Sequence, residues 1–395
     1  MILYTLIAVI TIILAFQVNN AAQNEYDHIS ISGKSALGSS ARLLAGYTTR
    51  QKAINTLCLL SVFVVLTSLA CLRHEVGNDY GTYVVTCHEI FQKGYVVTEP
   101  GFNLVVRILY TLSGKEDYLL MFGVFGAAIV AIFLKVLVDQ SASFAWGFFV
   151  FMTMGFYYRS FNTVRYYFAL AIATFALRYL INIDIQGLIK FFCLILFAAT
   201  FHKSVLVVIP MYFLARIPWK RWALLILAAF SGLAALLHNQ IMDLALKLYP
   251  SYRNTVYIEE VHTITENAAP MFGCLFILAL CLYCYKEAIE DHADNRMYMT
   301  MNIMALALYI SCYWLPLITR FAYYLTTCQI LLLPNLICSI KDKQKRKRVS
   351  AVVCIFCALY FLYFLRQADA VGVRVLPYKT WLFYDHRWLN QTDTF

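Results

Sequence analysis

The stretch YLLMFGVFGAAIVAIFLKVLV, residues 118–138, decides the fold class of this chain. It is apolar apart from Lys135, and it is as long as the roughly 20 residues that an α-helix needs to cross a bilayer. Similar runs recur at 2–18, 54–72, 144–158, 161–181, 219–237, 271–285, 297–315, 320–338 and 349–365. The sequence therefore predicts an all-α, polytopic transmembrane helical bundle.

The overall composition favours a membrane protein over a soluble one. Of the 395 residues, 61% are hydrophobic and 14% are charged, whereas an average soluble domain carries about a quarter charged residues. A soluble chain of this length would need polar surface that this sequence lacks. We therefore expect residues 1–395 to form a single integral membrane domain. We interpret the net charge of +10 as a signal of topology and not of nucleic-acid binding.

A basic run, KDKQKRKR at residues 341–348, sets the orientation. Short loops rich in Lys and Arg stay in the cytoplasm, so 339–348 is predicted to be a basic cytoplasmic loop. The polar segment 19–53, which also carries basic residues, is predicted to be a second one. Counting crossings between these loops places both termini outside, in the periplasm, together with three segments: 73–117, 238–270 and the tail 366–395.

The stretch 188–214 leaves two topologies open, because His202 and Lys203 interrupt it. A single crossing buries both residues near the midplane, where a Lys costs roughly 2.5–3.5 kcal/mol. Two short crossings, 188–201 and 204–217, place them at the outer rim and give about twelve spans, within a range of 10–12. The two-crossing topology also makes 102–113 a re-entrant or interfacial helix. We favour it because 102–113 is too short to span comfortably.

Polar residues gather in four clusters on the outer side of this topology. Arginines bind phosphate oxygens in pairs through their planar fork, and a carboxylate or an imidazole can accept a hydroxyl proton. Each residue also has a structural explanation, such as an arginine that snorkels to the interface or a tyrosine in an aromatic belt. Taken together, the clusters predict an outward-facing site for a phosphorylated or anionic lipid-linked substrate. Their main residues are Arg73, Asp79 and Tyr80; Asn162 and Arg165; His202; and Arg320 and Tyr323.

The same residues carry a resemblance to a known family. The motifs are R-x5-D-Y-x2-Y from Arg73 to Tyr83, E-P-G-F-N at 99–103, N-x2-R from Asn162 to Arg165, F-H-K-S at 201–204, T-R-F-A-Y-Y at 319–324 with Leu333 and Pro334 after it, and L-P-Y at 376–378. With these motifs in this order, the chain resembles the EpsG family of Wzy-type exopolysaccharide and O-antigen polymerases from about residue 1 to about residue 385. Tyr166 stands where the family more often has Gln, so no role for a Gln is carried over. The acid motif reads N-D-Y, so only Asp79 is carried over.

This resemblance implies an enzyme that joins undecaprenyl-diphosphate-linked oligosaccharide repeat units into a surface polysaccharide, which is an exopolysaccharide, a capsule or an O-antigen. The growing chain is transferred to the non-reducing end of an incoming lipid-linked repeat, at the outer face of the bacterial inner (cytoplasmic) membrane. No cofactor, metal or nucleotide sugar is implied. The implied partners are the lipid-linked oligosaccharide, membrane lipid, a flippase and a chain-length regulator.

We expect His202 to be the base that activates the acceptor hydroxyl, with Asp79 as the second choice. Arg165 and Arg320 are expected to bind diphosphate, and the remaining substrate-binding candidates are Arg73, Asn162, Tyr80 and Tyr323. Two other functions stay open. A glycosyltransferase or ligase acting on lipid-linked sugars would normally show an acidic pair in its first outer loop. A transporter or flippase of lipid-linked oligosaccharide would carry charges along a central cavity.

Overall fold

The computed structural model of the chain describes residues 1–18, 48–94, 96–181, 183–217, 229, 231–234, 236–248, 267–315, 318–370 and 373–383. Within these residues the chain is helical, and its one β-bridge joins Arg73 to Thr380. The predicted all-α class is confirmed. Residues 19–47 of the predicted loop 19–53, most of the predicted span 219–237 and most of the loop 238–270 lie outside the described residues. Residues 49–53 of the predicted loop belong to a helix that begins at Thr49.

Five helical segments of the described chain are long and apolar enough to cross a membrane. They are α4 (Thr49–Cys71), α7 (Tyr118–Gln140), α10 with α11 (Val164–Ala176 and Arg178–Ile181), α20 with α21 (Ile318–Thr326 and Gln329–Ser339) and α22 (Lys343–Gln367). Shorter apolar helices accompany them: α1 (Ile2–Gln17), α8 (Phe144–Thr153), α12 (Ile185–Ala199) and α17 (Ala268–Tyr283). The chain is therefore an integral membrane protein.

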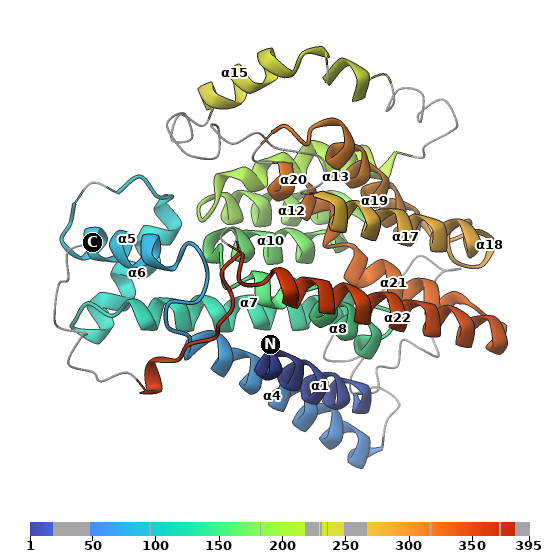
Figure 1. Ribbon diagram of the computed structural model, residues 1–395, viewed down its shortest axis with the longest axis horizontal. Coiled ribbons are helices and arrows are strands. Elements are labelled where there is room, and N and C mark those ends of the chain that lie inside the picture. The colour runs from blue at the N-terminus through green and yellow to red at the C-terminus, as the bar shows by residue number, and fades with distance from the viewer. Residues whose placement is uncertain are drawn as a thin grey trace.

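The helix α7 lies at the centre of the bundle, between α4 and α10 (Figure 1). Its sequence is apolar on all sides, as expected for a helix that neighbours surround. Asp117 begins the helix by accepting a hydrogen bond from the backbone N–H of Leu120 at 3.1 Å. The first and last turns of α7 mark the two ends of the bundle, which we name the Tyr118 end and the Asp139 end.

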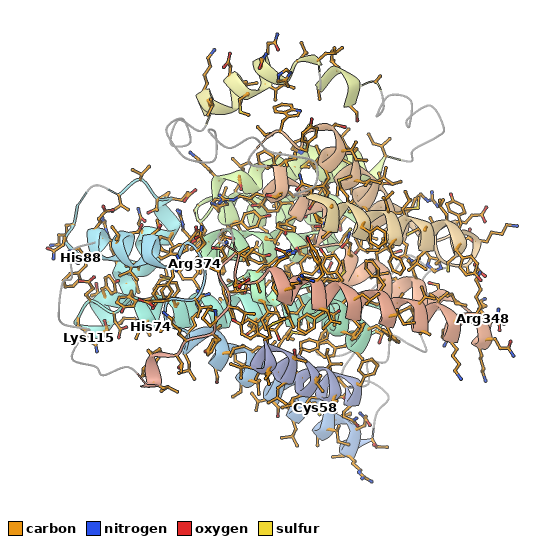
Figure 2. The ribbon with its side chains drawn as sticks, viewed as in Figure 1. Cys58, His74, His88, Lys115, Arg348 and Arg374 are labelled. Atoms are coloured by element: carbon orange, nitrogen blue, oxygen red, sulfur yellow. The ribbon has the colours of Figure 1, made fainter. Side chains whose placement is uncertain are left out.

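Ion pairs of the described residues concentrate at these two ends. At the Asp139 end, Asp139 pairs with Arg178 at 2.6 Å and Lys345 of α22 pairs with Glu287 at 2.6 Å. At the Tyr118 end lies a hairpin of α5 (Tyr80–Phe91) and α6 (Pro100–Ser113). Figure 2 shows His88 and Lys115 at this end of the molecule and Arg348 at the opposite end. Charge is thus kept away from the apolar middle of the bundle.

The chain reverses direction at His202. The helix α12 ends at Ala199, a 3-10 turn η1 covers Lys203–Val207, and α13 (Val208–Arg216) runs back beside α12. Phe213, near the end of α13, lies 5.9 Å from Phe191, near the start of α12, between ring centroids. The helix α11 contacts both α12 and α13. His202 therefore sits in the turn of a helical hairpin, at the Tyr118 end.

Several helices differ from the predicted runs. The helix α5 was not predicted, because its polar residues hide a buried stripe of Tyr80, Tyr83, Cys87 and Ile90. The run 144–158 breaks at Gly155, which has a φ of 77°, into α8 and the short α9 (Phe156–Arg159). The helix α22 begins inside the predicted basic loop 339–348, because Asp342 caps it by accepting from the N–H groups of Gln344 and Lys345. Lys and Arg are good helix formers, so the basic run continues the helix.

The remaining elements complete the arrangement. The helices α18 (Tyr285–Ala288) and α19 (Ala293–Ser311) lead to α20. The helix α15 (His238–Leu248) lies at the edge of the bundle (Figure 1), where Ile241 and Met242 pack against a cluster that includes Cys312 and Ile318. After α22 the chain returns along the Tyr118 end to a 3-10 turn, η4 (Trp381–Phe383). On the way, Tyr378 donates to the carbonyl of Leu69 at 2.9 Å. The C-terminal segment thereby holds the end of α4.

Candidate functional site

The site is built around Glu99, which immediately precedes α6. Its neighbour Gly101 donates its N–H to the carbonyl of Thr200 at 2.8 Å. A Cβ at position 101 would lie 2.3 Å from the Thr200 Oγ1, so only glycine permits this approach. The E-P-G motif is therefore fixed directly against the turn that contains His202.

The Glu99 carboxylate joins two segments that are distant in the sequence. Its Oε2 accepts from Nη1 of Arg165 at 2.5 Å, and its Oε1 accepts from the backbone N–H of Lys203 at 3.2 Å. The same Oε1 lies 3.6 Å from Nδ1 of His202. We call Glu99, Arg165 and His202 the Glu99 cluster. Its members come from the α5–α6 hairpin, the first turn of α10 and the α12–α13 turn.

Aromatic rings and one hydroxyl fix Arg165. Its guanidinium lies over the ring of Phe102 at 5.4 Å and over that of Tyr83 at 5.8 Å. The Tyr83 hydroxyl accepts from the backbone N–H of Arg165 at 3.1 Å. The Nε of Arg165 is buried and lacks a hydrogen-bond partner among the described residues. A guanidinium has five N–H donors, so the pair with Glu99 leaves donors available for a second anion.

His202 presents an imidazole with both of its nitrogens unengaged. The side chain is 16% exposed, and neither Nδ1 nor Nε2 has a hydrogen-bond partner within the described part of the chain. Its ring meets the ring of Tyr166 edge to face at 5.5 Å, and the Tyr166 hydroxyl donates to the carbonyl of Arg320 at 2.6 Å. This imidazole is oriented by packing, and it can accept a proton from a bound molecule.

Glu99 and His202 differ in their protonation states at neutral pH. Burial lowers the pKa of His202, so the imidazole is neutral near pH 7, although the nearby Glu99 carboxylate opposes this shift. For Glu99, burial acts to raise the pKa, but the neighbouring His202 imidazole and the Arg165 charge outweigh it and lower the pKa to about 2. Glu99 is therefore ionised at neutral pH and is a weak base. His202 is the stronger candidate for proton transfer.

A framework behind the cluster holds Asp79 in place. Asp79 donates its backbone N–H to Oδ1 of Asn162 at 3.1 Å, and a Cβ on Gly77 would meet the carbonyl oxygen of Phe161 at 2.4 Å. Burial raises the pKa of Asp79, while the charges of Arg320 and Arg165 act in the opposite direction. Asp79 and Arg320 therefore lie within electrostatic reach of the Glu99 cluster.

The other predicted substrate-binding residues lie elsewhere. Arg73 is 2% exposed, donates to the carbonyl of Phe161 at 2.5 Å and lies between the rings of Phe122 and Phe161. Tyr80 stacks on Phe122 at 4.6 Å. Tyr323 faces Arg159, on another side of α10. Arg73 and Tyr80 thus build the framework at the start of α5, and Tyr323 belongs to a separate group of side chains.

Glu99 was not among the residues predicted for the site. The sequence does contain one indication that Glu99 belongs to the site. Glu99 is an acid immediately before Pro100, at the start of an apolar segment of the predicted outer loop. A Pro in the first turn marks a helix N-terminus, which places the preceding carboxylate at a defined position. The spacing between residues 99, 165 and 202 gives no indication that they meet, because their contact depends on the packing of three hairpins.

The Gly101–Thr200 contact yields a stability prediction. We expect Gly101→Ala to lower the free energy of unfolding by roughly 1–3 kcal/mol, because the new methyl group collides with Thr200 and the turn must move. Gly81→Ala is the matched control, since a Cβ at that position in α5 meets nothing within 4 Å. The measurement is thermal unfolding of both purified variants in detergent. Equal stability of the two variants would show that the hairpin does not seat on the His202 turn.

Comparison with known proteins gives one match. The model of the EpsG family matches residues 56–380, which include every motif quoted above. No match was found among curated proteins or among solved structures. The match covers most of the chain and confirms the predicted resemblance. The chain therefore belongs to the EpsG family, the family of exopolysaccharide and Wzy-type polymerases.

Proposed function

We propose that this protein polymerises undecaprenyl-diphosphate-linked oligosaccharide repeat units into exopolysaccharide, capsule or O-antigen. The observation that carries the proposal is the Glu99 cluster, which places an arginine with available donors beside a neutral imidazole at one end of a membrane bundle. Diphosphate binding and proton transfer are the two tasks that such a reaction requires. Membership of the EpsG family supports a membrane polysaccharide polymerase.

We propose that the Tyr118 end faces the outside of the bacterial inner membrane. About twelve spans then cross the membrane, and both termini lie outside. The loops 73–117 and 238–270 and the tail 366–395 would be external, and 19–53 and 339–348 would be cytoplasmic. The clustering of α5, α6, the His202 turn and the C-terminal segment at one end supports this topology, as does the reversal of the chain between α12 and α13.

Arg165 binds the diphosphate of the donor in this mechanism. Glu99 fixes one edge of the guanidinium, and the remaining N–H groups face the diphosphate. The bond between the donor sugar C1 and the diphosphate oxygen breaks, and the electron pair leaves with the diphosphate. The Arg165 charge offsets the negative charge that develops there, and Arg320 adds a second positive charge nearby.

His202 accepts the proton of the acceptor hydroxyl, whose oxygen forms the new bond to the donor C1. The resulting imidazolium lies beside the Glu99 carboxylate, which stabilises it. Asp79 is the second candidate base, because burial makes its carboxylate more basic than an exposed one. A flippase and a chain-length regulator are proposed as partners that supply repeat units and set polymer length.

A ligase that transfers the finished chain from the same lipid carrier would use the same cluster, but Glu99 is the single carboxylate of that cluster and does not form the acidic pair expected of such an enzyme. A transporter is disfavoured by the sorting of charge to two ends among the described residues.

Deletion of the gene separates these functions. A polymerase deletion leaves single repeat units on the surface lipid in place of long chains, as read on a gel. A complete loss of surface repeat units would place the block before polymerisation and contradict the proposal.

Arg165→Lys tests the role of the guanidinium. A lysine keeps the charge but loses the planar fork, so we expect polymerisation in the deletion strain, restored with this variant, to fall by about tenfold or more. Arg348→Lys, at the opposite end, is the matched control and should restore wild-type chain length. Full activity of Arg165→Lys would show that paired contacts to phosphate are unnecessary.

The pH dependence tests the base. Because burial lowers the pKa of His202 below its usual value of 6.5, the rate should stay high at neutral pH and fall as the pH drops through that lowered pKa. Glu99→Gln removes the charge that favours the imidazolium, so the acid limb should move to lower pH. Initial rates with purified protein and lipid-linked repeat units measure this shift. An acid limb that moves upward, or one that persists unchanged in His202→Ala, would exclude His202 as the base.

A further inference from the structure

A second arginine, Arg159, lies in a pocket on another side of the first turn of α10. Two adjacent tyrosines of α10 separate the two arginines. Tyr166 touches His202 in the Glu99 cluster, whereas Tyr167 lies within electrostatic reach of Arg159. The Arg159 pocket is formed between α9, α17, α20, α21 and α22. It shares no lining residue with the Glu99 cluster.

No carboxylate neutralises Arg159 among the described residues. Its guanidinium lies 5.4 Å from the ring centroid of Tyr323 and 5.2 Å from that of Phe364, and it hydrogen-bonds the hydroxyl of Tyr360. Two other arginines of the bundle, Arg165 and Arg178, each have an acid partner. A cation enclosed in a membrane protein is normally paired or faces a functional cavity.

Arg73 shows how the fold treats an arginine that has a purely structural role. It also lacks an acid, but two rings cover its guanidinium, it donates to a backbone carbonyl, and it is 2% exposed. Arg159 is less buried and lines a small cavity instead. Packing alone therefore accounts for Arg73 and leaves the donors of Arg159 unexplained.

One unpaired hydroxyl lines the same pocket, and two more lie within electrostatic reach of Arg159. Thr326 lines it, is 4% exposed, and its Oγ1 has no hydrogen-bond partner in the described part of the chain. The buried hydroxyls of Tyr167 and Tyr309, within electrostatic reach of Arg159, likewise lack partners there. A buried hydroxyl without a hydrogen-bond partner destabilises the fold. A planar guanidinium fork together with several hydroxyl donors matches the oxygens of a phosphate group.

We infer that the Arg159 pocket is a second, separate binding site for a phosphate-bearing group, and that it takes the diphosphate of the acceptor lipid. The second part rests on the proposed function. Both substrates of such a polymerase carry a diphosphate, and the two anions repel each other within one site. The reacting hydroxyl of the acceptor lies a full repeat unit away from its own diphosphate. A site across α10 lets that hydroxyl reach His202 while the acceptor lipid is held apart from the donor.

Binding stoichiometry tests this inference. The probe is farnesyl diphosphate, titrated into the purified full-length protein in detergent and counted by native mass spectrometry. We expect two equivalents for wild type, one for Arg159→Gln, one for Arg165→Gln and none for the double variant. Arg348→Gln, an exposed arginine at the opposite end (Figure 2), is the control and should keep both equivalents.

Two milder variants guard against misfolding. Arg159→Lys should weaken the second equivalent by about tenfold, because lysine cannot bind two phosphate oxygens through a planar fork. Tyr360→Phe keeps the ring and should weaken the same equivalent alone. Inorganic pyrophosphate should compete at this site, which would identify the phosphate oxygens as the recognised group.

Retention of two equivalents by Arg159→Gln would overturn the inference. If phosphatidylglycerol binds at Arg159 and farnesyl diphosphate does not, the pocket holds bulk lipid and the assignment to the acceptor is wrong. The assay needs no catalysis, so it is independent of the proposed function. If Arg159→Gln loses one equivalent but the wild-type protein shows no polymerase activity, the proposed function is wrong and the second site stands. If the wild-type protein polymerises but Arg159→Gln keeps both equivalents, the function stands and the second site is wrong.

Discussion

The ion pair between Glu99 and Arg165 links parts of the chain that the sequence holds far apart. A charge at the edge of a membrane bundle is costly unless it is neutralised or reaches water, and each of these two residues neutralises the other. The carboxylate also accepts the N–H of Lys203, so the turn of the α12–α13 hairpin is tied to the same point. Three helical hairpins therefore meet at one carboxylate. His202 is positioned by that meeting, and neither of its ring nitrogens has a hydrogen-bond partner among the described residues.

The membrane imposes the second constraint, which is the separation of the ion pairs of the described residues into two ends. The middle of α7 is packed with aromatic and aliphatic side chains such as Phe125, Ile129 and Phe133. Asp139 closes one end by pairing with Arg178 and Lys135, while Asp117 caps the helix at the other end. Because the apolar interior excludes charge, short segments distant in the sequence are brought to a common surface. A site built from loops, turns and first helical turns is the consequence.

Much of the fold follows from the sequence because apolar length is a strong signal. The runs at 54–72, 118–138 and 349–365 each correspond to a helix long enough to span. Interruptions were harder to predict: Gly155 breaks one run through a positive φ, and α5 is hidden by its polar residues. The basic run after Asp342 is helical because capping and propensity outweigh its charge. These features depend on local geometry that hydropathy does not report.

The candidate site was predictable in part. His202, Arg165, Asp79 and Arg320 do lie near one another, because each is a polar residue at the same end of an apolar helix. Glu99 was missed, and Arg73 and Tyr80 occupy the framework instead of an open surface. Such assignments depend on which face of a helix a residue occupies relative to its neighbours. A single sequence does not contain that information, since an arginine that binds substrate and one that packs between rings look alike.

Cysteine labelling tests the proposed outward orientation of the Glu99 cluster most directly. In a background without the native cysteines, Lys203→Cys would report on the His202 turn and Lys343→Cys on the opposite end, since both side chains are exposed. Intact spheroplasts are treated with a membrane-impermeant maleimide. The account predicts labelling at position 203 and protection at position 343 until the membrane is opened. Labelling at 343 with protection at 203 would contradict it and turn the site toward the cytoplasm.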